Sequence, residues 1–368
     1  MPGAAPLRLY WIAGEDSGDL HTAGLIGALR ERHPALALRG VGGDRMAAAG
    51  VELLAHVRDI NFMGFWEVVK HLGTIRRLFR QTEADIRAWK PDAAVLTDYP
   101  GFNLRMARFL HRQGIPVVYY ISPQVWAWKE GRVEQIRRYV RRMICILPFE
   151  QAFYQRHGLE VAYAGHPLLD VIGEPDPAER EPVLALLPGS REQEIRRMLP
   201  EMLEAAAQFP ELQAVVAGAP SQPEALYREL IGSRQASLVM NQTYPLLRRA
   251  QLALVTSGTA TLETALHGVP QAVCYKGAQL SYLIARRLIR VPYISLVNLI
   301  LNRPAVRELI QHQCTAPDMA AALREVQQPE AAARIQQDYA DLRSRLGSRG
   351  ASARAAAALL DALFPTPG

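Results

Sequence analysis

The sequence predicts an α/β protein with two doubly wound domains, each built on a parallel β-sheet. Three observations carry this prediction. Short apolar runs, such as 93–97 and 253–256, suit strands that are buried on both faces. A tight loop and a helical pattern follow several of these runs, as expected for a repeating strand-loop-helix unit. The chain has 368 residues, too many for one ordinary core, and 49% of them are hydrophobic.

The bulk composition limits the function classes. The net charge of +6 favours anionic partners without choosing among nucleic acid, phosphorylated metabolites and acidic lipid. Cys145, Cys274 and Cys314 have no close or metal-type spacing, so we expect neither a disulfide framework nor a zinc site. We find no signal peptide and no apolar run long enough to cross a bilayer, and therefore expect a cytoplasmic protein that could adhere to a membrane surface.

The first domain is predicted to open with a strand over 7–14, a loop over 15–19 and a helix over 20–32. The loop has one glycine where the dinucleotide fingerprint has three, and its acids would repel a pyrophosphate. We therefore expect it to meet sugar hydroxyls, amides or an amine. Alternatively Ser17 and Asp19 cap the helix, and both interpretations can hold.

The segment 61–89 combines aromatic, aliphatic and basic residues at helical spacing. This pattern suits a membrane surface or a groove for acyl chains. Periodicity alone favours the alternative of a core-facing helix with a solvated basic face. A second aromatic and basic segment, 125–142, includes Trp126 and Trp128 and suits the boundary between water and an apolar phase.

Asp98 ends the apolar run 93–98 and precedes a Tyr99-Pro100 turn. Ligands of open α/β sheets bind beyond the carboxyl ends of strands, so Asp98 is our first candidate for a general base. The alternative is that Asp98 caps the following helix.

A proline-rich linker is predicted over 173–182. It would separate a first domain, 1–172, from a second, 183–345, and a C-terminal helix at about 346–368 could pack on the first domain.

In the second domain, Arg191 follows a predicted strand and a Gly189-Ser190 turn, a suitable place for a phosphate clamp. A positive charge at a helix start opposes the helix dipole, which favours a bound anion over an ordinary surface arginine. The turn 257–259 joins a strand to a helix over 260–266, and its unpaired backbone N–H groups suit a phosphate. Glu263 could accept hydrogen bonds from a sugar diol. The alternative is an ordinary capped helix with a solvent-facing Glu263.

Nine short motifs lie along the chain in a fixed order and spacing. They are Ala13 to Asp19, Met63-Gly64 with Glu67-Val68, Asp98 with Phe102-Asn103, Ser122 to Trp128, Leu147 to Glu150, Gly165-His166, Leu186 to Arg191, Ser257 to Glu263 and Tyr293 to Asn298. In this order and spacing the chain resembles the lipid-A-disaccharide synthase family, from about residue 10 to about residue 315.

The resemblance implies a GT-B fold, with two Rossmann-like domains facing across a cleft. It implies transfer, with inversion, of 2,3-diacylglucosamine from its UDP derivative to 2,3-diacylglucosamine 1-phosphate (lipid X). The products would be a β-1,6-linked disaccharide 1-phosphate and UDP. It also implies no metal or other cofactor, no nucleic-acid partner, a peripheral position on the anionic inner face of the inner membrane, and a possible homodimer that exchanges C-terminal parts.

The resemblance also implies the site residues. Asp98 would be the base, with His21 as a rival because it lies close to the first loop. The residues expected to bind the UDP donor are Gly189, Ser190, Arg191, Ser257, Gly258, Thr259, Thr261, Glu263 and Asn298. Those expected on the acceptor side are Glu15, Ser17, Gly18, Asp19, Met63, Glu67 and Gln124.

The chain departs from the family pattern at three places. Asp16 stands where the family has Ala, and His21 stands where it has an aliphatic residue. Asn302-Arg303-Pro304 stands where it has Gly-Arg-Glu, although Glu308 remains nearby. Two other functions stay open. A GT-B epimerase would turn over a UDP-aminosugar without an acceptor, and a non-catalytic lipid- or nucleic-acid-binding protein would release no UDP. UDP release with and without a lipid acceptor distinguishes all three.

Overall fold

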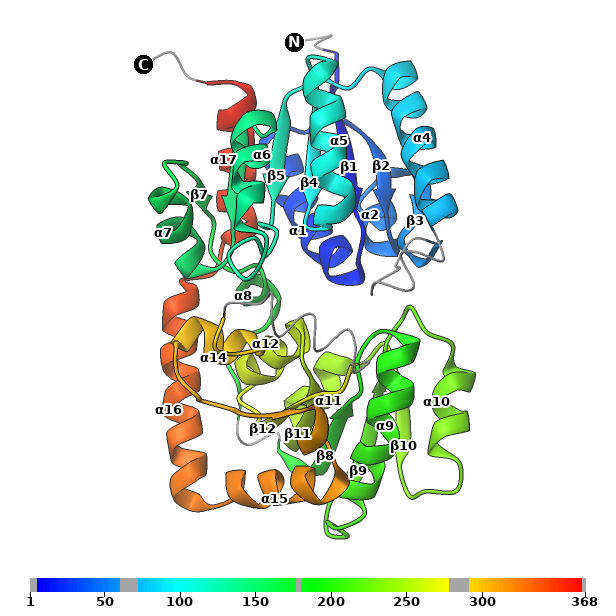
Figure 1. Cartoon of the computed structure of the whole chain (residues 1–368), viewed down its shortest axis with the longest axis vertical. Coiled ribbons are helices and arrows are strands. Elements are labelled where there is room, and N and C mark those ends of the chain that lie inside the picture. Colours follow the sequence, from blue (N-terminus) through cyan, green and yellow to red (C-terminus); the bar gives the residue numbers. More distant parts are fainter. Residues whose placement is uncertain (1–4, 60–71, 177–179, 278–290, 366–368) are drawn as a thin grey trace. The chain divides into compact units, whose positions relative to one another are not determined.

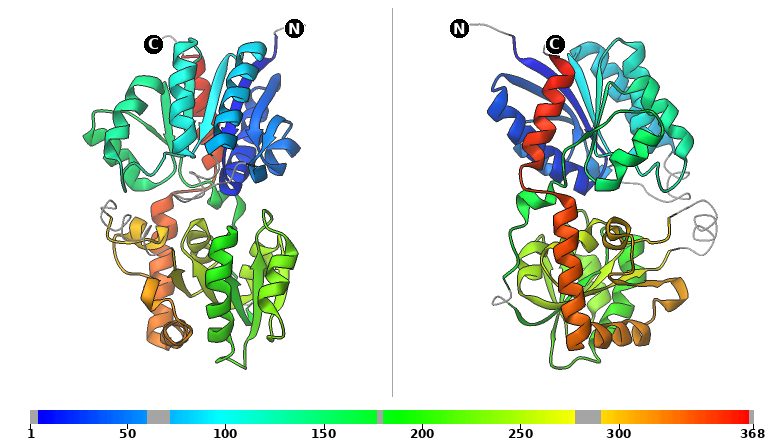
Figure 2. Two further views of the ribbon diagram at one scale, coloured as in Figure 1. Left: turned by 45° about the vertical axis from the view of Figure 1, so that its right-hand side comes forward. Right: turned by 90° about the vertical axis from the view of Figure 1, so that its left-hand side faces the viewer.

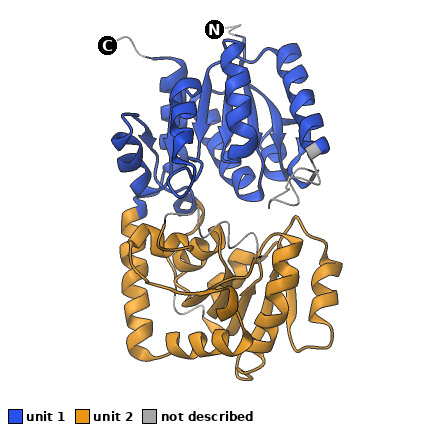
Figure 3. Cartoon of the chain, in the orientation of Figure 1, with its two compact units in different colours: residues 1–170, 346–368 blue, residues 171–345 orange. Residues whose placement is uncertain are grey.

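The computed structural model describes residues 5–59, 72–176, 180–277 and 291–365 (Figure 1). It divides into two compact units (Figure 3). Unit 1 comprises residues 1–170 and 346–368, and unit 2 comprises residues 171–345. The chain therefore leaves unit 1 near Asp170 and returns to it after Arg345.

Within the described residues, unit 1 contains a seven-stranded sheet in which every recorded pairing is parallel. The strand order is β3-β2-β1-β4-β5-β6-β7. The strands are β1 (Leu7–Ala13), β2 (Leu36–Gly42), β3 (Glu52–His56), β4 (Ala93–Thr97), β5 (Val117–Tyr120), β6 (Arg142–Cys145) and β7 (Ala162–Tyr163).

Helices cover both faces of this sheet (Figures 1 and 2). They are α1 (Asp16–Arg32), α2 (Asp44–Ala48), α4 (Leu72–Trp89), α5 (Pro100–Arg112), α6 (Val133–Tyr139), α7 (Pro148–Arg156), α8 (Leu168–Val171) and α17 (Ala351–Leu363), with 3-10 turns η1 (Val57–Asp59) and η2 (Glu130–Arg132). The C-terminal α17 packs against α1. Strands such as β4, whose five residues are all buried, explain why the sequence reads there as a continuous apolar run.

Unit 2 repeats this architecture with a parallel six-stranded sheet in the order β10-β9-β8-β11-β12-β13. The strands are β8 (Glu181–Leu187), β9 (Gln213–Gly218), β10 (Ser237–Met240), β11 (Ala250–Thr256), β12 (Gln271–Tyr275) and β13 (Arg307–Ile310). The helices are α9 (Glu192–Ala206), α10 (Glu224–Ile231), α11 (Thr243–Arg249), α12 (Thr259–Leu266), α14 (Leu296–Leu301), α15 (Ala316–Val326) and α16 (Pro329–Leu346), with the 3-10 turn η4 (Gln311–Gln313).

Each sheet has one point where the strand order reverses direction. In unit 1 it lies between β1 and β4, and in unit 2 between β8 and β11. Loops at the carboxyl ends of such neighbouring strands diverge to opposite faces of the sheet and leave a crevice between them, which is where open α/β sheets bind ligands. The fold therefore makes four loops candidates: those after β1, β4, β8 and β11.

The first predicted loop is wrong in its extent. Residues 16–19 belong to the first turn of α1, which begins at Asp16 and not at Leu20. The backbone N–H of Asp19 donates to the carbonyl of Glu15, which closes that turn. Acidic residues in a first turn interact favourably with the helix dipole, so Asp16 and Asp19 favour the early start. Only Gly14 and Glu15 remain between β1 and the helix.

Some predictions fall outside the described residues, among them Met63 and Glu67 of the proposed acceptor side. In the part of the chain that is described, no helix has both the length and the apolar character needed to cross a membrane.

Candidate active site

Asp98 directly follows β4, and Glu15 lies two residues after β1, so both flank the switch point of unit 1. Asp98 and Tyr99 both adopt left-handed backbone conformations, with φ of 44° and 48°. The buried Asn103 amide fixes this turn: its Nδ2 donates to the carbonyls of Asp98 at 2.8 Å and Thr97 at 3.1 Å. The hydroxyl of Tyr119 also donates to the Asp98 carbonyl.

Burial, followed by the neighbouring carboxylate of Glu15, raises the pKa of Asp98 to about 8. A carboxyl group with a pKa near the working pH is a good general base, because it is ionised often enough and still binds a proton strongly. The rival base His21 is buried, and its ring lies edge-on to that of His166, with 5.8 Å between centroids. Burial, followed by the charge of Arg45, lowers the pKa of His21 to about 4, which makes it the weaker proton acceptor.

Asp19 has a structural partner that the sequence did not reveal. Its buried carboxylate accepts backbone N–H groups of Gly43 at 2.7 Å, Met46 at 3.0 Å and Arg45 at 3.1 Å. It therefore caps α2 rather than its own helix. Gly18 is also buried, and a Cβ there would lie in ordinary contact with Ala13 and Thr97, whereas Ser17 is half-buried.

The loop after β5 is anchored by a buried acid. Glu150 is 1% exposed and accepts the indole N–H of Trp126 at 3.1 Å, together with the backbone N–H of Leu147 at 3.0 Å. Burial raises the pKa of Glu150 to about 7. Gln124, in the same loop, is exposed. Sequence reasoning quoted Glu150 within a motif but gave it no role.

In unit 2, the loop 189–191 after β8 wraps around Glu194. Arg191 is the N-cap residue of α9, and its Nη1 donates to Glu194 Oε1 at 2.7 Å. The backbone N–H of Ser190 donates to the other carboxylate oxygen at 3.3 Å. Gly189 has φ of 107°, and a Cβ there would meet Glu194 at 2.6 Å. The helix-start arginine thus has an internal counter-ion, which the sequence reading overlooked.

The turn after β11 leads directly into α12, which starts at Thr259 with Gly258 as its N-cap residue. No side chain caps this helix start among the described residues, and a Cβ on the exposed Gly258 would meet nothing within 4 Å. The Ser257 hydroxyl donates to the carbonyl of Ile294 at 3.0 Å. Thr261 is fully buried, and its hydroxyl donates to the Gly258 carbonyl at 2.8 Å.

A hydrogen-bond network in the neighbouring segment 294–308 of the same chain supports the Ser257 turn. The carboxylate of Glu308 accepts the backbone N–H groups of Ile294 at 3.1 Å and Ser295 at 2.9 Å. It also accepts Nδ2 of Asn298 at 2.9 Å. Asn298 is 1% exposed, and its Oδ1 accepts the N–H of Val306 at 2.9 Å. Glu308 and Asn298 therefore position the segment that holds Ser257.

Glu263, in the second turn of α12, accepts the hydroxyl of Tyr244 at 3.1 Å, another partner that sequence reasoning missed. Asn298 and Glu308 also line a cavity of about 410 Å³ together with Tyr293. Among the described residues we find no group of three or more His, Cys, Asp or Glu side chains placed to hold a metal ion.

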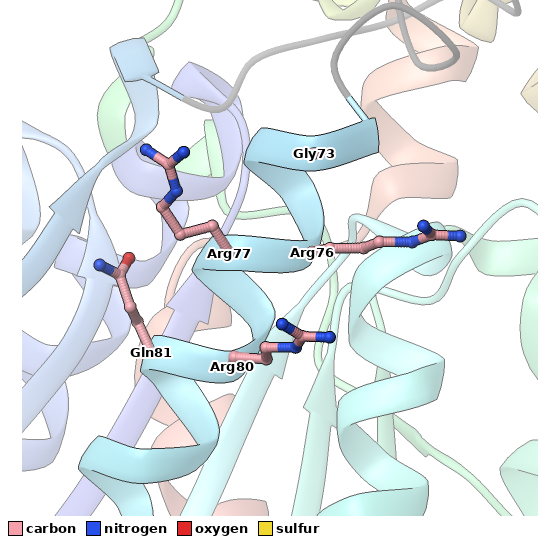
Figure 4. Close-up of a pocket in the computed structure, with 5 residues that line it drawn as sticks. All are labelled: Gly73, Arg76, Arg77, Arg80 and Gln81. Atoms are coloured by element: carbon pink, nitrogen blue, oxygen red, sulfur yellow. The ribbon is translucent and has the colours of Figure 1, made fainter.

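A basic cavity of about 420 Å³ lies at the start of α4 and is lined by Gly73, Arg76, Arg77, Arg80 and Gln81 (Figure 4). Figure 4 shows that Arg77 and Gln81 extend to one side of the helix and Arg76 and Arg80 to the other, so the three guanidinium groups do not converge on one point. This arrangement suits diffuse attraction to an anionic surface better than a single phosphate.

Comparison with known proteins places this chain in a family. The family model described as lipid-A-disaccharide synthetase matches residues 9–362. The chain belongs to the lipid-A-disaccharide synthase family. A lipid-A-disaccharide synthase from Myxococcus xanthus is 42% identical over 381 residues, which cover 98% of each chain. Membership of this family makes the protein a glycosyltransferase of lipid A synthesis.

Solved structures confirm the GT-B fold predicted from the sequence. The calicheamicin glycosyltransferase CalG4 aligns with a TM-score of 0.62 at 18% identity, covering 99% of this chain and 100% of that one. The UDP-GlcNAc 2-epimerase from Neisseria meningitidis, bound to UDP-GlcNAc, aligns with a TM-score of 0.66 at 12% identity, covering 96% of this chain and 100% of that one. At these identities the likeness concerns the fold alone.

Proposed function

We propose that this protein transfers 2,3-diacylglucosamine from its UDP derivative to O6 of 2,3-diacylglucosamine 1-phosphate, with inversion, and releases UDP. The observation that carries the proposal is the carboxylate of raised pKa at the switch point of unit 1, in a chain that belongs to the lipid-A-disaccharide synthase family. The family match favours transfer over the alternatives of an epimerase or a non-catalytic binding protein.

In this proposal unit 2 binds the UDP donor. The diphosphate accepts hydrogen bonds from the start of α12, where backbone N–H groups and the helix dipole favour negative charge. Ser257 and Thr259 border this helix start, and Arg191 follows the adjacent strand of the sheet. As the bond to the sugar breaks, the same groups stabilise the developing charge on UDP. The Glu263 carboxylate, oriented by Tyr244, accepts the ribose hydroxyls.

Asp98 acts as the base. Its carboxylate takes the proton from the acceptor 6-hydroxyl, and the oxygen attacks the anomeric carbon on the face opposite UDP, which inverts the configuration. Glu15 and Gln124 complete the acceptor side.

The lipid substrates require access to a membrane, and we propose that the basic cavity at the start of α4 attracts its anionic surface. The protein would then be peripheral on the cytoplasmic face of the inner membrane.

The test measures UDP release in detergent with the donor alone, with both lipids, and with Asp98→Ala. We expect release only when both lipids are present, and a loss of turnover on the order of a hundredfold or more in the variant. Asp361→Asn, an exposed carboxylate on α17, serves as the control and should retain activity. Donor turnover without acceptor would indicate an epimerase. Normal turnover by Asp98→Ala would refute the assignment of the base.

A further inference from the structure

Two cations converge on one aromatic ring in the loop between β5 and α6. The ammonium of Lys129 lies 4.2 Å from the ring centroid of Trp128, and the guanidinium carbon of Arg132 lies 5.6 Å from the same centroid. Trp128 is 36% exposed, and Lys129 has a left-handed backbone with φ of 60°. The loop is fixed on its other side, where Trp126 donates to the buried Glu150.

The cationic cluster formed by Lys129, Arg132 and the nearby Arg105 lacks a counter-ion among the described residues. No described carboxylate pairs with Lys129, Arg132 or the nearby Arg105 of α5, although Arg137, one turn further along, pairs with Glu134 at 2.8 Å. Burial, followed by the charge of Arg132, lowers the pKa of Lys129, and burial also lowers the pKa of Arg132 despite the opposing effect of Tyr119. Positive charges that repel one another and are partly withdrawn from water are stabilised by a bound anion.

The cluster also neighbours the proposed base. Arg132 lies within electrostatic range of Tyr119, whose hydroxyl donates to the carbonyl of Asp98. Helix α5, which contains Arg105, packs against α6, which begins directly after Arg132 (Figure 1). In the acceptor sugar, C1 carries the phosphate and C5 carries the C6 hydroxyl that acts as nucleophile, and both carbons flank the ring oxygen. A phosphate site beside Asp98, in the same unit but separate from it, therefore matches the acceptor.

We propose that Lys129, Arg132 and Arg105 bind the phosphate group of the acceptor, so that this loop selects a phosphorylated amino sugar over its unphosphorylated form. This inference rests on the proposed function. Guanidinium groups suit a phosphate because their planar N–H groups form paired, charge-assisted hydrogen bonds with its oxygens. The three arginines of the α4 cavity lie on two sides of the helix, and so they are poorer candidates for a single phosphate (Figure 4).

The first experiment compares Lys129→Gln and Arg132→Gln with the parent protein in steady-state kinetics. The acceptors are 2,3-diacylglucosamine 1-phosphate and 2,3-diacylglucosamine. We expect KM for the phosphorylated acceptor to rise about tenfold or more, as for the loss of a hydrogen bond to a charged group. The kcat, and all constants for the unphosphorylated acceptor, should remain nearly unchanged. Arg112→Gln, an exposed arginine near the end of α5, is the matched control.

A second measurement separates this proposal from the proposed function. Titration calorimetry with water-soluble glucosamine 1-phosphate should show binding to the parent and to Arg112→Gln, and weaker binding to both loop variants, whether or not transfer occurs. If the parent transfers sugar to neither lipid but this pattern is found, the proposed function fails and the phosphate site stands. Equal binding by all four proteins overturns the phosphate site.

A vesicle assay distinguishes the acceptor phosphate from a phospholipid headgroup. Sedimentation with phosphatidylglycerol vesicles should be the same for the parent and the loop variants. If the variants lose vesicle binding and lose activity equally with both acceptors, the cluster serves the membrane surface and the inference is wrong. Because Lys129 is exposed, its variant should fold even if Arg132→Gln does not, and thermal melting checks both.

Discussion

At the residue scale, the turn that carries the proposed base is held in an unfavourable conformation. Asp98 and Tyr99 are consecutive left-handed residues, each at a cost of about 1–2 kcal/mol for a residue other than glycine. Asn103 and Tyr119 offset this cost through hydrogen bonds to the Asp98 carbonyl. Strained backbone persists only where its surroundings determine it, and it often marks a functional position.

We predict that Asn103→Ala loosens this turn. The buried carbonyls of Thr97 and Asp98 would lose a donor, at a cost of about 1–3 kcal/mol in the free energy of unfolding. Turnover should fall further than stability alone explains, because Asp98 would no longer be fixed. Urea unfolding and UDP release measure the two effects. A variant with lower stability but normal kcat would show that the amide serves only the fold.

The raised pKa of Asp98 predicts the pH dependence of the reaction. A base must be ionised, so kcat/KM should rise with pH and level off above about 8. Glu15→Gln removes the largest charge effect on this carboxyl group, which lowers its pKa and should move the rising limb to lower pH. A pH profile of UDP release with saturating donor tests this. An unmoved limb in Glu15→Gln would assign the titration to another group.

At the element scale, some helix N-termini in this fold are capped by a carboxylate, whereas that of α12 is capped by no described side chain. The carboxylate of Asp19 caps α2, and that of Asp170 caps α17 through the N–H groups of Gly350, Ala351 and Ser352. The start of α12 has no such side chain. A helix start that is closed by an acid stabilises the fold, whereas an open one can accept an anionic ligand.

We predict that Glu308→Ala weakens donor binding through the segment 293–295. Without the carboxylate, the N–H groups of Ile294 and Ser295 lose their acceptor, and the carbonyl that accepts the Ser257 hydroxyl is no longer fixed. KM for the UDP donor should rise about tenfold, consistent with the loss of one or two hydrogen bonds. Acceptor KM is the internal control. A rise in acceptor KM alone would contradict this role for Glu308.

At the scale of the whole molecule, the last helix belongs to the first unit. Residues 346–368 return to unit 1, where α17 packs against α1 and is capped by Asp170. Burial would raise the pKa of Asp170, but the hydrogen bonds from Ser352, Gly350 and Ala351 prevail and hold it below its usual value. The two segments of unit 1, 1–170 and 346–368, are therefore joined by a helix cap between residues 180 positions apart in the sequence.

The lowered pKa predicts acid sensitivity of this contact. Because the folded-state pKa lies below the unfolded value, the cap contributes its full stability above pH 4, and this contribution is lost as the pH falls through the folded-state pKa. Asp170→Asn should destabilise unit 1 at neutral pH, with a smaller difference from the parent near pH 3. Hydrogen exchange of α17 against pH measures this. Equal protection of α17 in both proteins at pH 7 would contradict the prediction.

Local sequence patterns were sufficient to determine the two parallel-sheet domains. Apolar runs, the tight loops after them and helical periodicity are properties of residues that are close in the sequence. The GT-B prediction is confirmed by the order of the strands and by the solved structures. The motifs also placed the chain in its family. The start of α1 was misjudged, because acidic residues suit both a ligand loop and the first turn of a helix.

Only the tertiary structure decided which charges have partners. Asp19 caps a helix 24 residues away, and Arg303 pairs with Asp338 across 35 residues. Lys129 and Arg132 meet at Trp128 without a described counter-ion, and Arg132 lies within electrostatic range of Tyr119. Burial and pairing depend on distances between segments remote in the chain, and these distances set the pKa values. The sequence thus determined which groups are present, and the fold determined which of them remain available to a ligand.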